Sequence, residues 1–402
     1  MNRADHNPAI DALRGAAILL VMLLHYSLSY RLHDSPLQAL IPVGTLRTIF
    51  YNGNYGVSIF FVISGFLITT NVFRRYGSLA RVDVMHFYRL RLFRLYPLVV
   101  MALLIIAALG AAGFSHFNNA IDHKPLGFGF FLLANFSVLT FWHNVLMENA
   151  GYFNYAMNIY WSLSVEEVFY LAYPLVLLVA RRRWQLVVLA TLCIVAAPVY
   201  RWVHRDDELF YLYGNVACLD MLAYGCIAAV IARAAVIRAR MRRLLGGTLL
   251  VVMALVYMQG IPGNEALGAS MLGVATAALL VCVSRGTSQR GGRLAAPLAW
   301  LGAHSYELYL FHIVVLGVMI DLVPRTAMAY GWKLPMLAVF LTVSAFSAWI
   351  AARFVGDPFN RYLRARYGEL MRHSPAHPIP PAISPARGAP SGLPASEGTA
   401  GP

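Results

Sequence analysis

Two ionisable residues, Arg14 and His25, lie inside the first long apolar stretch of the chain. An α-helix turns about 100° per residue, so a separation of eleven brings His25 to within roughly 20° of the face that carries Arg14, about 16 Å farther along the axis. Ionisable groups at membrane depth usually mark a path or a binding site, because exposure to lipid would cost each of them several kcal/mol. Contacts between packed helices can also hold such side chains, and this pair alone leaves both interpretations open.

Other ionisable residues lie in later apolar stretches. The segment W-S-L-S-V-E-E places Glu166 and Glu167 next to each other near the outer end of a predicted span, at the depth expected for His25. Close packing gives no reason for two carboxylates at that depth. Three more residues can each be a satisfied partner between helices: Asp220, Glu307 and His312.

Arg91 and Arg94 lie three residues apart just before a predicted span, so their guanidinium groups project from one side at the membrane surface. Guanidinium groups bind phosphate through forked hydrogen bonds. Arginines also anchor the cytoplasmic ends of spans, and this second interpretation stays open. The elements that position all of these residues must be membrane helices.

The composition supports this conclusion. Of 402 residues, 59% are hydrophobic and only 12% are charged, which is more apolar sequence than one soluble core needs. The apolar runs are too long for barrel strands, so the expected fold is an all-α polytopic membrane protein. The four cysteines lie in apolar segments without metal-ligand spacing, so we expect neither disulfides nor a metal site. Asp11 and Arg14 interrupt the first apolar run, which argues against a cleavable signal peptide.

The net charge of +14 is distributed as in a membrane protein. Nearly all of the positive charge is arginine, and it gathers in four short segments near residues 74–94, 181–183, 233–243 and 285–293. Such clusters mark cytoplasmic loops. We therefore expect the lipid bilayer as a partner and no nucleic acid.

The apolar segments predict about ten transmembrane helices, near 10–31, 55–73, 95–113, 160–180, 184–202, 211–232, 245–259, 267–284, 300–320 and 334–355. Another apolar stretch, 125–142, would put the arginines at 181–183 outside if it crossed the membrane. It is therefore expected to be re-entrant or interfacial, which places both termini in the cytoplasm. Residues 1–366 would form one membrane-embedded domain, and residues 367–402, rich in Pro, Ala, Ser and Gly, a disordered cytoplasmic tail.

The ordered set of motifs resembles the acyltransferase 3 family, bacterial integral-membrane O-acyltransferases, over about residues 8–365. The matching motifs are D-A-L-R-G with Arg14 and His25, G-V-x-x-F-F-V-I-S-G-F-L-I at 56–68, R-x-x-R-x-x-P at 91–97, W-S-L-S-V-E-E at 161–167 and L-G-x-x-S-Y-x-L-Y-L-x-H at 301–312. Two residues depart from the family pattern. Val168 stands where the family commonly has glutamine, and Asp357 stands where it commonly has glutamate. Some relatives carry an esterase-like domain after the last span, whereas this chain is expected to be a stand-alone form.

The resemblance implies an enzyme of the bacterial inner membrane that transfers an acyl group, expected to be acetyl, from acyl-CoA to a sugar hydroxyl of a polysaccharide, lipopolysaccharide or glycolipid. Arg14, Arg91 and Arg94 would bind the phosphates of the donor. His25 would act as a general base or carry the acyl group, and Glu166 or Glu167 would orient its imidazole. The acceptor would meet polar and aromatic side chains of the loop at 143–158: Tyr152, Asn154, Tyr155 and Asn158. The two tyrosines can equally be aromatic anchors at the membrane interface. No permanently bound cofactor is expected.

Two other classes of function fit the same pattern. Buried Arg, His, Glu and Asp residues in ten helices also describe a proton-coupled transporter or a flippase for a sugar-containing substrate. Transporters commonly contain paired repeats, and the two halves of this sequence show no repeat. A non-catalytic membrane partner with the same fold is the third class, and the presence of both Arg14 and His25 argues against it.

Overall fold

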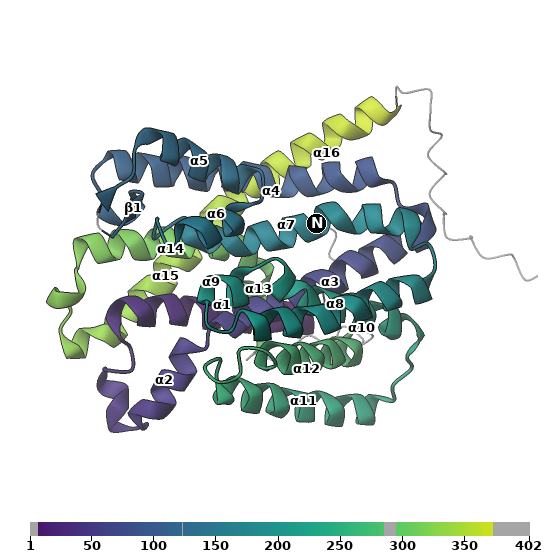
Figure 1. Cartoon of the computed structure of the whole chain (residues 1–402), viewed down its shortest axis with the longest axis horizontal. Helices are drawn as coiled ribbons and strands as arrows, with labels where there is room; N and C mark the ends of the chain where they lie inside the picture. Colours follow the sequence, from purple (N-terminus) through teal and green to yellow (C-terminus); the bar gives the residue numbers. More distant parts are fainter. Residues whose placement is uncertain (1–6, 123, 285–294, 373–402) are drawn as a thin grey trace, which may run out of the picture.

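The computed structural model describes residues 7–122, 124–284 and 295–372, and in these ranges the chain forms a bundle of helices (Figure 1). The long helices are α1 (Pro8–Tyr30), α3 (Asn54–Tyr76), α4 (Val84–Ala111), α7 (Trp161–Val179), α8 (Arg183–Val203), α10 (Leu219–Ala234), α11 (Ala239–Gln259), α14 (Ser305–Leu322) and α15 (Lys333–Ala351). The shorter ones are α2 (Val43–Tyr51), α5 (Phe128–Leu139), α6 (His143–Ala150), α9 (Glu208–Tyr213), α12 (Gly268–Val283), α13 (Ala295–Ala303) and α16 (Asp357–Arg372). A small antiparallel pair, β1 (Ala120–Ile121) and β2 (Lys124–Pro125), follows α4.

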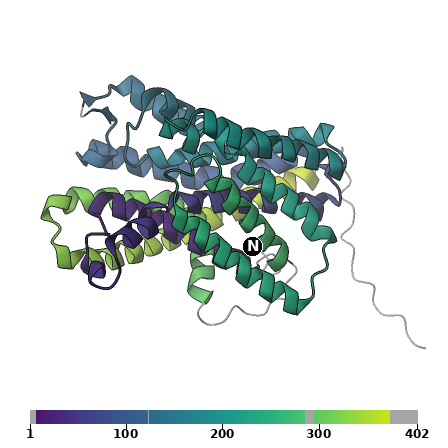
Figure 2. The ribbon, with the colours of Figure 1, turned by 60° about the horizontal axis from the view of Figure 1, so that its bottom comes forward.

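The polytopic all-α fold is confirmed. Nine segments of the described residues are helical, long and apolar enough to cross a membrane, and each overlaps one of the predicted spans. The tenth predicted span, 267–284, is the shorter helix α12, which packs against α3, α10 and α11. In the turned view, α4 to α7 lie on one side of α1, α14 and α15 (Figure 2).

Three of the four predicted arginine clusters lie at one end of the bundle, where the loops 77–83, 180–182 and 235–238 connect the helices (Figure 1). We call this the basic end. The fourth cluster, 285–293, lies outside the described residues. The loops that follow α1 and α14 lie at the other end, which we call the opposite end.

The apolar stretch at 125–142 forms the short helix α5, which makes a helical hairpin with α6. Helix α5 has 12 residues, or about 18 Å, against a hydrocarbon core of roughly 30 Å. The chain reverses at Phe141, whose φ is 64°, and the hydroxyl of Ser137 lies 2.7 Å from Nδ1 of His143 across the turn. The amide of His143 donates to Ser164 at 3.0 Å, which fixes the hairpin to α7.

Two close helix crossings depend on glycine. A Cβ on Gly15 of α1 would lie 1.8 Å from a carbonyl oxygen of α13, and a Cβ on Gly302 of α13 would lie 1.7 Å from a carbonyl oxygen of α1. Helices α3 and α10 cross in the same way at Gly65 and Gly225, where the corresponding distances are 2.0 and 2.1 Å. Small residues let helix backbones approach this closely, and the first crossing fixes the position of the neighbouring Arg14.

A buried ion pair joins α8, α10 and α12. Nη2 of Arg201 lies 2.7 Å from Oδ2 of Asp220, and Ser270 donates to the same carboxylate at 2.7 Å. Both charged side chains are at most 3% exposed. The interpretation of Asp220 as a satisfied partner between helices is confirmed.

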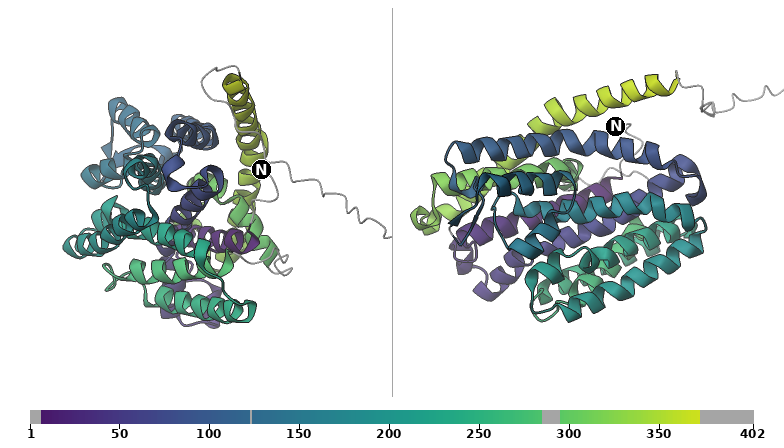
Figure 3. Two further views of the ribbon diagram at one scale, coloured as in Figure 1. Left: turned by 90° about the vertical axis from the view of Figure 1, so that its right-hand side faces the viewer. Right: turned by 45° about the horizontal axis from the view of Figure 1, so that its top comes forward.

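The C-terminal helix crosses the predicted domain boundary at residue 366. After α15, a π-helical turn (Ala352–Gly356) leads into α16, which lies along α4 (Figure 3). The ring of Tyr367 contacts those of His86 and Phe93, with centroid distances of 5.8 and 6.2 Å. These contacts hold α16 against α4 beyond the predicted boundary. The rest of the predicted tail, 373–402, lies outside the described residues.

Candidate active site

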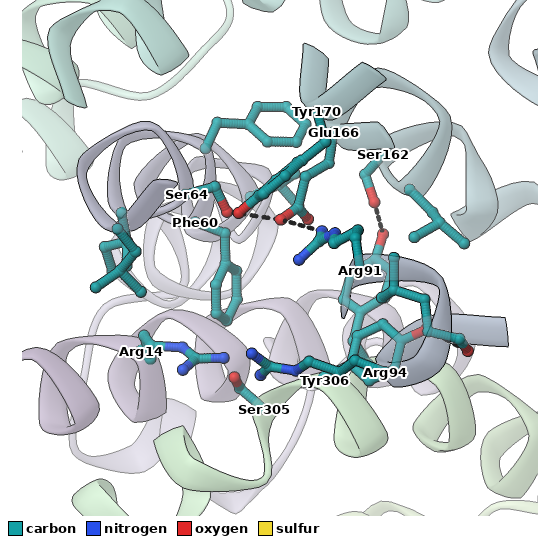
Figure 4. Close-up of a pocket in the computed structure, with 17 residues that line it drawn as sticks. Arg14, Phe60, Ser64, Arg91, Arg94, Ser162, Glu166, Tyr170, Ser305 and Tyr306 are labelled. Carbon is teal, nitrogen blue, oxygen red and sulfur yellow. Dashed lines mark hydrogen bonds and ion pairs between the residues drawn. The ribbon is translucent and has the colours of Figure 1, made fainter. Parts of the chain in front are cut away.

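A cavity toward the basic end brings the predicted arginine residues together with Glu166 (Figure 4). It encloses about 800 Å³, including its open mouth, and is lined by residues of α1, α3, α4, α7 and α14. The lining includes Arg14, Phe60, Ser64, Arg91, Arg94, Ser162, Glu166, Tyr170, Ser305, Tyr306 and Tyr309. Asn7 caps α1 by accepting the amide of Ala9 at 3.0 Å, and Asp83 caps α4 by accepting that of His86 at 2.9 Å. Arg14 and Arg91 therefore each lie about two turns inside a capped helix.

Arg91 is held by the two adjacent carboxylates of α7. Its Nε lies 2.9 Å from Oε1 of Glu167 and its Nη2 lies 3.0 Å from Oε1 of Glu166, while Nη2 also bonds Glu167. Ser64 donates to Glu166 at 2.7 Å, and the ring of Tyr170 lies 3.6 Å from the guanidinium carbon. Glu167 is only 2% exposed, so the charge of Arg91 offsets the cost of burying its carboxylate.

This arrangement corrects two expectations. The sequence places Arg91 and Arg94 just before a span that begins near residue 95, whereas α4 begins at Val84 and contains both arginines. Hydropathy misses this start because the arginines interrupt the apolar pattern. The sequence also places Glu166 and Glu167 beside His25, whereas the structure places them on Arg91, to which charge attraction in a low-dielectric interior binds them.

Arg14 and Arg94 line the same cavity, with their guanidinium groups facing each other beside Ser305 (Figure 4). Neither arginine forms a hydrogen bond or an ion pair with another described residue, and the buried hydroxyl of Ser305 likewise has no partner among them. Glu166 is already bound to Arg91. The cavity therefore keeps two guanidinium groups and one hydroxyl available, an arrangement that attracts an anion.

Farther along α1, the ring of His25 lies next to that of His312 in α14, with a centroid distance of 5.3 Å. His312 is fully buried, and its Nδ1 lies 2.9 Å from the carbonyl oxygens of both Leu308 and Tyr309. Two carbonyl acceptors require the proton to be on Nδ1, which leaves Nε2 of the neutral ring with a free lone pair. No described residue bonds Nε2. An imidazole of fixed tautomer therefore lies beside His25.

One side of α14 connects the cavity with these two imidazoles. Tyr306, Tyr309 and His312 are spaced three residues apart, so they follow one another along the helix. The two tyrosines line the cavity, and the ring of Tyr309 lies 5.9 Å from that of His312. Ser162 of α7 donates to the hydroxyl of Tyr309 at 2.5 Å. Sequence reasoning identified His312 only as a buried ionisable residue, and the spacing Y-x-x-Y-x-x-H was the signal that it follows the two tyrosines along one helix.

Polar residues also gather beyond His25, toward the opposite end. Nδ1 of His116 lies 2.7 Å from Oδ1 of Asp321, and the His116 ring contacts that of Tyr155 with a centroid distance of 5.2 Å. The hydroxyl of Tyr155 lies 2.9 Å from that of Ser29, one turn after His25. Burial raises the pKa of Tyr155, so its hydroxyl stays protonated and can donate. Sequence reasoning missed His116 and Asp321 because only the fold brings them together.

Three of the side chains predicted to meet the acceptor in the loop at 143–158 form hydrogen bonds within the protein. Asn154 is 3% exposed and donates to Asn119 at 2.7 Å, and Asn158 accepts the amide of Asn154 at 3.3 Å. The hydroxyl of Tyr152 donates to that of Tyr213 at 3.0 Å. These side chains hold the loop together, because buried amides must find hydrogen-bond partners within the protein.

Together, the helical spans and the arginine-lined cavity define a polytopic membrane protein whose helices α1 and α14 carry two neighbouring imidazoles farther along. Residues 7–354 match the family described as an acyltransferase domain. The chain therefore belongs to the acyltransferase 3 family, and the resemblance found in the sequence is confirmed.

Two curated proteins illustrate the relationship. O-acetyltransferase OatA of Staphylococcus aureus (strain NCTC 8325) is 23% identical over 377 residues, which cover 88% of this chain and 57% of OatA. "Putative peptidoglycan O-acetyltransferase YrhL" of Bacillus subtilis (strain 168) is 26% identical over 337 residues, which cover 77% of this chain and 48% of YrhL. The chain thus spans about half the length of the curated relatives that it matches. No solved structure matches it.

Proposed function

We propose that this protein transfers an acyl group, most simply acetyl, from acyl-CoA to a hydroxyl of a cell-envelope carbohydrate. Membership of the family supports acyl transfer, and the names of OatA and YrhL support an O-acetyltransferase and, for YrhL, peptidoglycan as the acceptor. The observation that carries the proposal is the placement of Arg14 and His25 on one helix, with the first in an anion-attracting cavity and the second beside His312.

The donor would bind with a phosphate group between Arg14 and Arg94, beside the hydroxyl of Ser305. Their guanidinium groups face each other and have no partner among the described residues (Figure 4). The pantetheine arm would then follow Tyr306 and Tyr309 toward the imidazoles. Arg91 takes no direct part in this proposal, because Glu166 and Glu167 bind it. The two glutamates thereby hold the wall of the donor site rather than orient His25.

His25 would act as the general base. As the acceptor hydroxyl attacks the thioester carbonyl, its proton moves to a ring nitrogen of His25, the new C–O bond forms and the C–S bond breaks. The leaving thiolate of CoA then takes the proton from His25. Nε2 of His312 would accept the N–H of His25 directly or through one water, so that the other nitrogen of His25 is free to accept a proton. A covalent acyl-histidine at His25 is the alternative route with the same residues.

The acceptor would approach from the opposite end, past Ser29, Tyr155 and the contact between His116 and Asp321. The donor would enter from the basic end. Arginine clusters normally lie on the cytoplasmic side, so this assignment puts acyl-CoA in the cytoplasm, the acceptor outside and both termini in the cytoplasm. The membrane would be the bacterial inner membrane.

The test is an acetyl-transfer assay on the purified full-length protein with radiolabelled acetyl-CoA and peptidoglycan fragments or other envelope glycans. We expect His25→Ala to lower kcat by about 10²- to 10⁴-fold, the usual contribution of a positioned acid-base group. His312→Ala should lower kcat with little change in the KM for acetyl-CoA. His304→Ala is the matched control, since that ring packs on Trp300 at a centroid distance of 4.4 Å and does not line the cavity.

The same assay addresses the alternative function. A proton-coupled transporter or flippase would move a sugar-containing substrate across a vesicle membrane without consuming acetyl-CoA. Hydrolysis or transfer that requires His25 supports the proposal. Retention of more than a few per cent of the wild-type rate by His25→Ala would remove this residue from the chemistry.

A further inference from the structure

A second cavity adjoins the candidate active site at the basic end. The two cavities share Leu67, Arg91, Arg94 and Tyr170 in their linings, so these four side chains lie between them. The second cavity adds Arg75 from the end of α3. It also adds an arginine from the C-terminal helix α16, Arg364, which lies outside the residue range of the family match.

The positive charge of this cleft is not balanced by a carboxylate among the described residues that line it. Arg75, Arg94 and Arg364 come from three different helices, all three are exposed, and no aspartate or glutamate lines the cleft with them. Arg91 forms ion pairs with Glu166 and Glu167, whereas Arg75, Arg94 and Arg364 form none with the described residues. Three guanidinium groups around one cleft repel one another in the absence of an anion, and they suit a ligand with several phosphate oxygens.

The fold holds Arg364 over this cleft. One turn farther along α16, the ring of Tyr367 contacts His86 and Phe93 of α4, and its face lies 5.0 Å from the guanidinium carbon of Arg89. These contacts join α16 to the helix that carries Arg94. Nε of Arg364 donates to the neutral side chain of Asn360 at 2.6 Å, which orients the guanidinium group without neutralising it.

We infer that this cleft binds the 3′-phosphorylated nucleotide end of the acyl-CoA donor. The inference rests on the proposed function and adds a second phosphate subsite to it. Arg75 and Arg364 would bind the 3′-phosphate, and Arg94, which lines both cavities, would bind the diphosphate between them. The rings of Tyr76 and Phe87, which also line the cleft, offer flat surfaces for the adenine base.

The experiment compares acetyl-CoA with acetyl-3′-dephospho-CoA as donors for the purified full-length protein. Wild-type protein should have a lower KM for acetyl-CoA. Arg364→Ala and Arg75→Ala should each raise that KM by about 10- to 100-fold, the value of one or two charge-assisted hydrogen bonds, and leave the KM for the dephospho donor unchanged. Arg366→Ala is the matched control, since Arg366 is an exposed arginine of the same helix that does not line the cleft.

Two results would overturn the inference while leaving the proposed function intact: equal use of both donors by the wild type, or an equal rise of both KM values in Arg364→Ala. Absence of transfer from either donor would overturn both proposals. Lipid phosphate is the other source of the same chemistry. If the arginines bound lipid, the Arg364→Ala defect would appear only in vesicles that contain phosphatidylglycerol, not in phosphatidylcholine alone, and it would be the same for both donors.

Discussion

At the scale of single residues, two arginines of the same helix have opposite surroundings. Arg91 is bound by Glu166 and Glu167, whereas Arg94 faces Arg14 without a partner among the described residues. Two arginines three residues apart on one helix therefore need not have the same role. The charge next to it decides whether a guanidinium group stabilises the protein or remains available for a ligand.

This contrast predicts different defects. Arg91→Ala leaves the buried carboxylate of Glu167 without its cation, which should cost about 3–5 kcal/mol and lower the thermal unfolding midpoint and the yield of folded protein. Arg94→Ala should keep the wild-type midpoint and raise the KM for acetyl-CoA. Thermal unfolding in detergent and donor kinetics measure both effects. Restoring the midpoint of Arg91→Ala by adding Glu166→Gln and Glu167→Gln would support the charge argument, and a wild-type midpoint in the single variant would contradict it.

At the scale of elements, the site depends on how closely α1 and α13 approach. Gly15 follows Arg14 directly, and its position against α13 leaves no room for a methyl group on either glycine. The crossing thereby fixes the height and rotation of α1, and with it the directions in which Arg14 and His25 point.

Gly302→Ala should therefore separate the two helices, lower the thermal unfolding midpoint and raise the KM for acetyl-CoA together, because a new Cβ would lie 1.7 Å from a carbonyl oxygen of α1. Gly247→Ala in α11 is the control, since no atom lies within 4 Å of its added Cβ. It should leave both quantities unchanged. A Gly302→Ala protein with normal stability and kinetics would show that the crossing can relax without cost.

Much of the helix inventory follows from sequence because apolar runs of sufficient length are visible locally. The start of α4 does not, since Arg91 and Arg94 fall inside the helix and depress its hydropathy. The contacts between the residues of the site are even harder to predict from the sequence. Nothing local to Glu167 indicates that its partner is Arg91, and nothing local to His25 indicates that its neighbour is His312, because helix packing decides both. Family motifs identified these residues without showing which of them meet.

At the scale of the whole molecule, the three described loops that carry arginine clusters lie at one end, and the contact between His116 and Asp321 lies toward the other. This polarity supports the proposed sidedness. The donor and the acceptor would enter from opposite ends of one bundle and meet at the imidazoles, so neither needs to cross the membrane.

Single cysteines introduced after removal of the four native ones test this polarity. Cysteines at Arg182 and Arg240 should react with an impermeant maleimide only from the cytoplasmic side, and those at Asn149 and Asp207 only from outside. Inside-out and right-side-out vesicles distinguish the two. Asn149 follows the hairpin of α5 and α6, so cytoplasmic labelling there would mean that this hairpin crosses the membrane. The two termini would then lie on different sides of the membrane, and the assignment of both to the cytoplasm would be wrong.

The placement of Arg14 and His25 on one uninterrupted helix gives the proposed site a fixed length. Their separation of eleven residues is set by the rise of α1, and Tyr306, Tyr309 and His312 lie in a row along α14 between the cavity and His25. No loop or hinge lies between the ends of either row. The bundle would therefore select its donor by the distance between the phosphate and the thioester of that donor. A donor with a longer or shorter arm would bind its phosphate at the arginines equally well. Its thioester carbon would nevertheless lie away from His25.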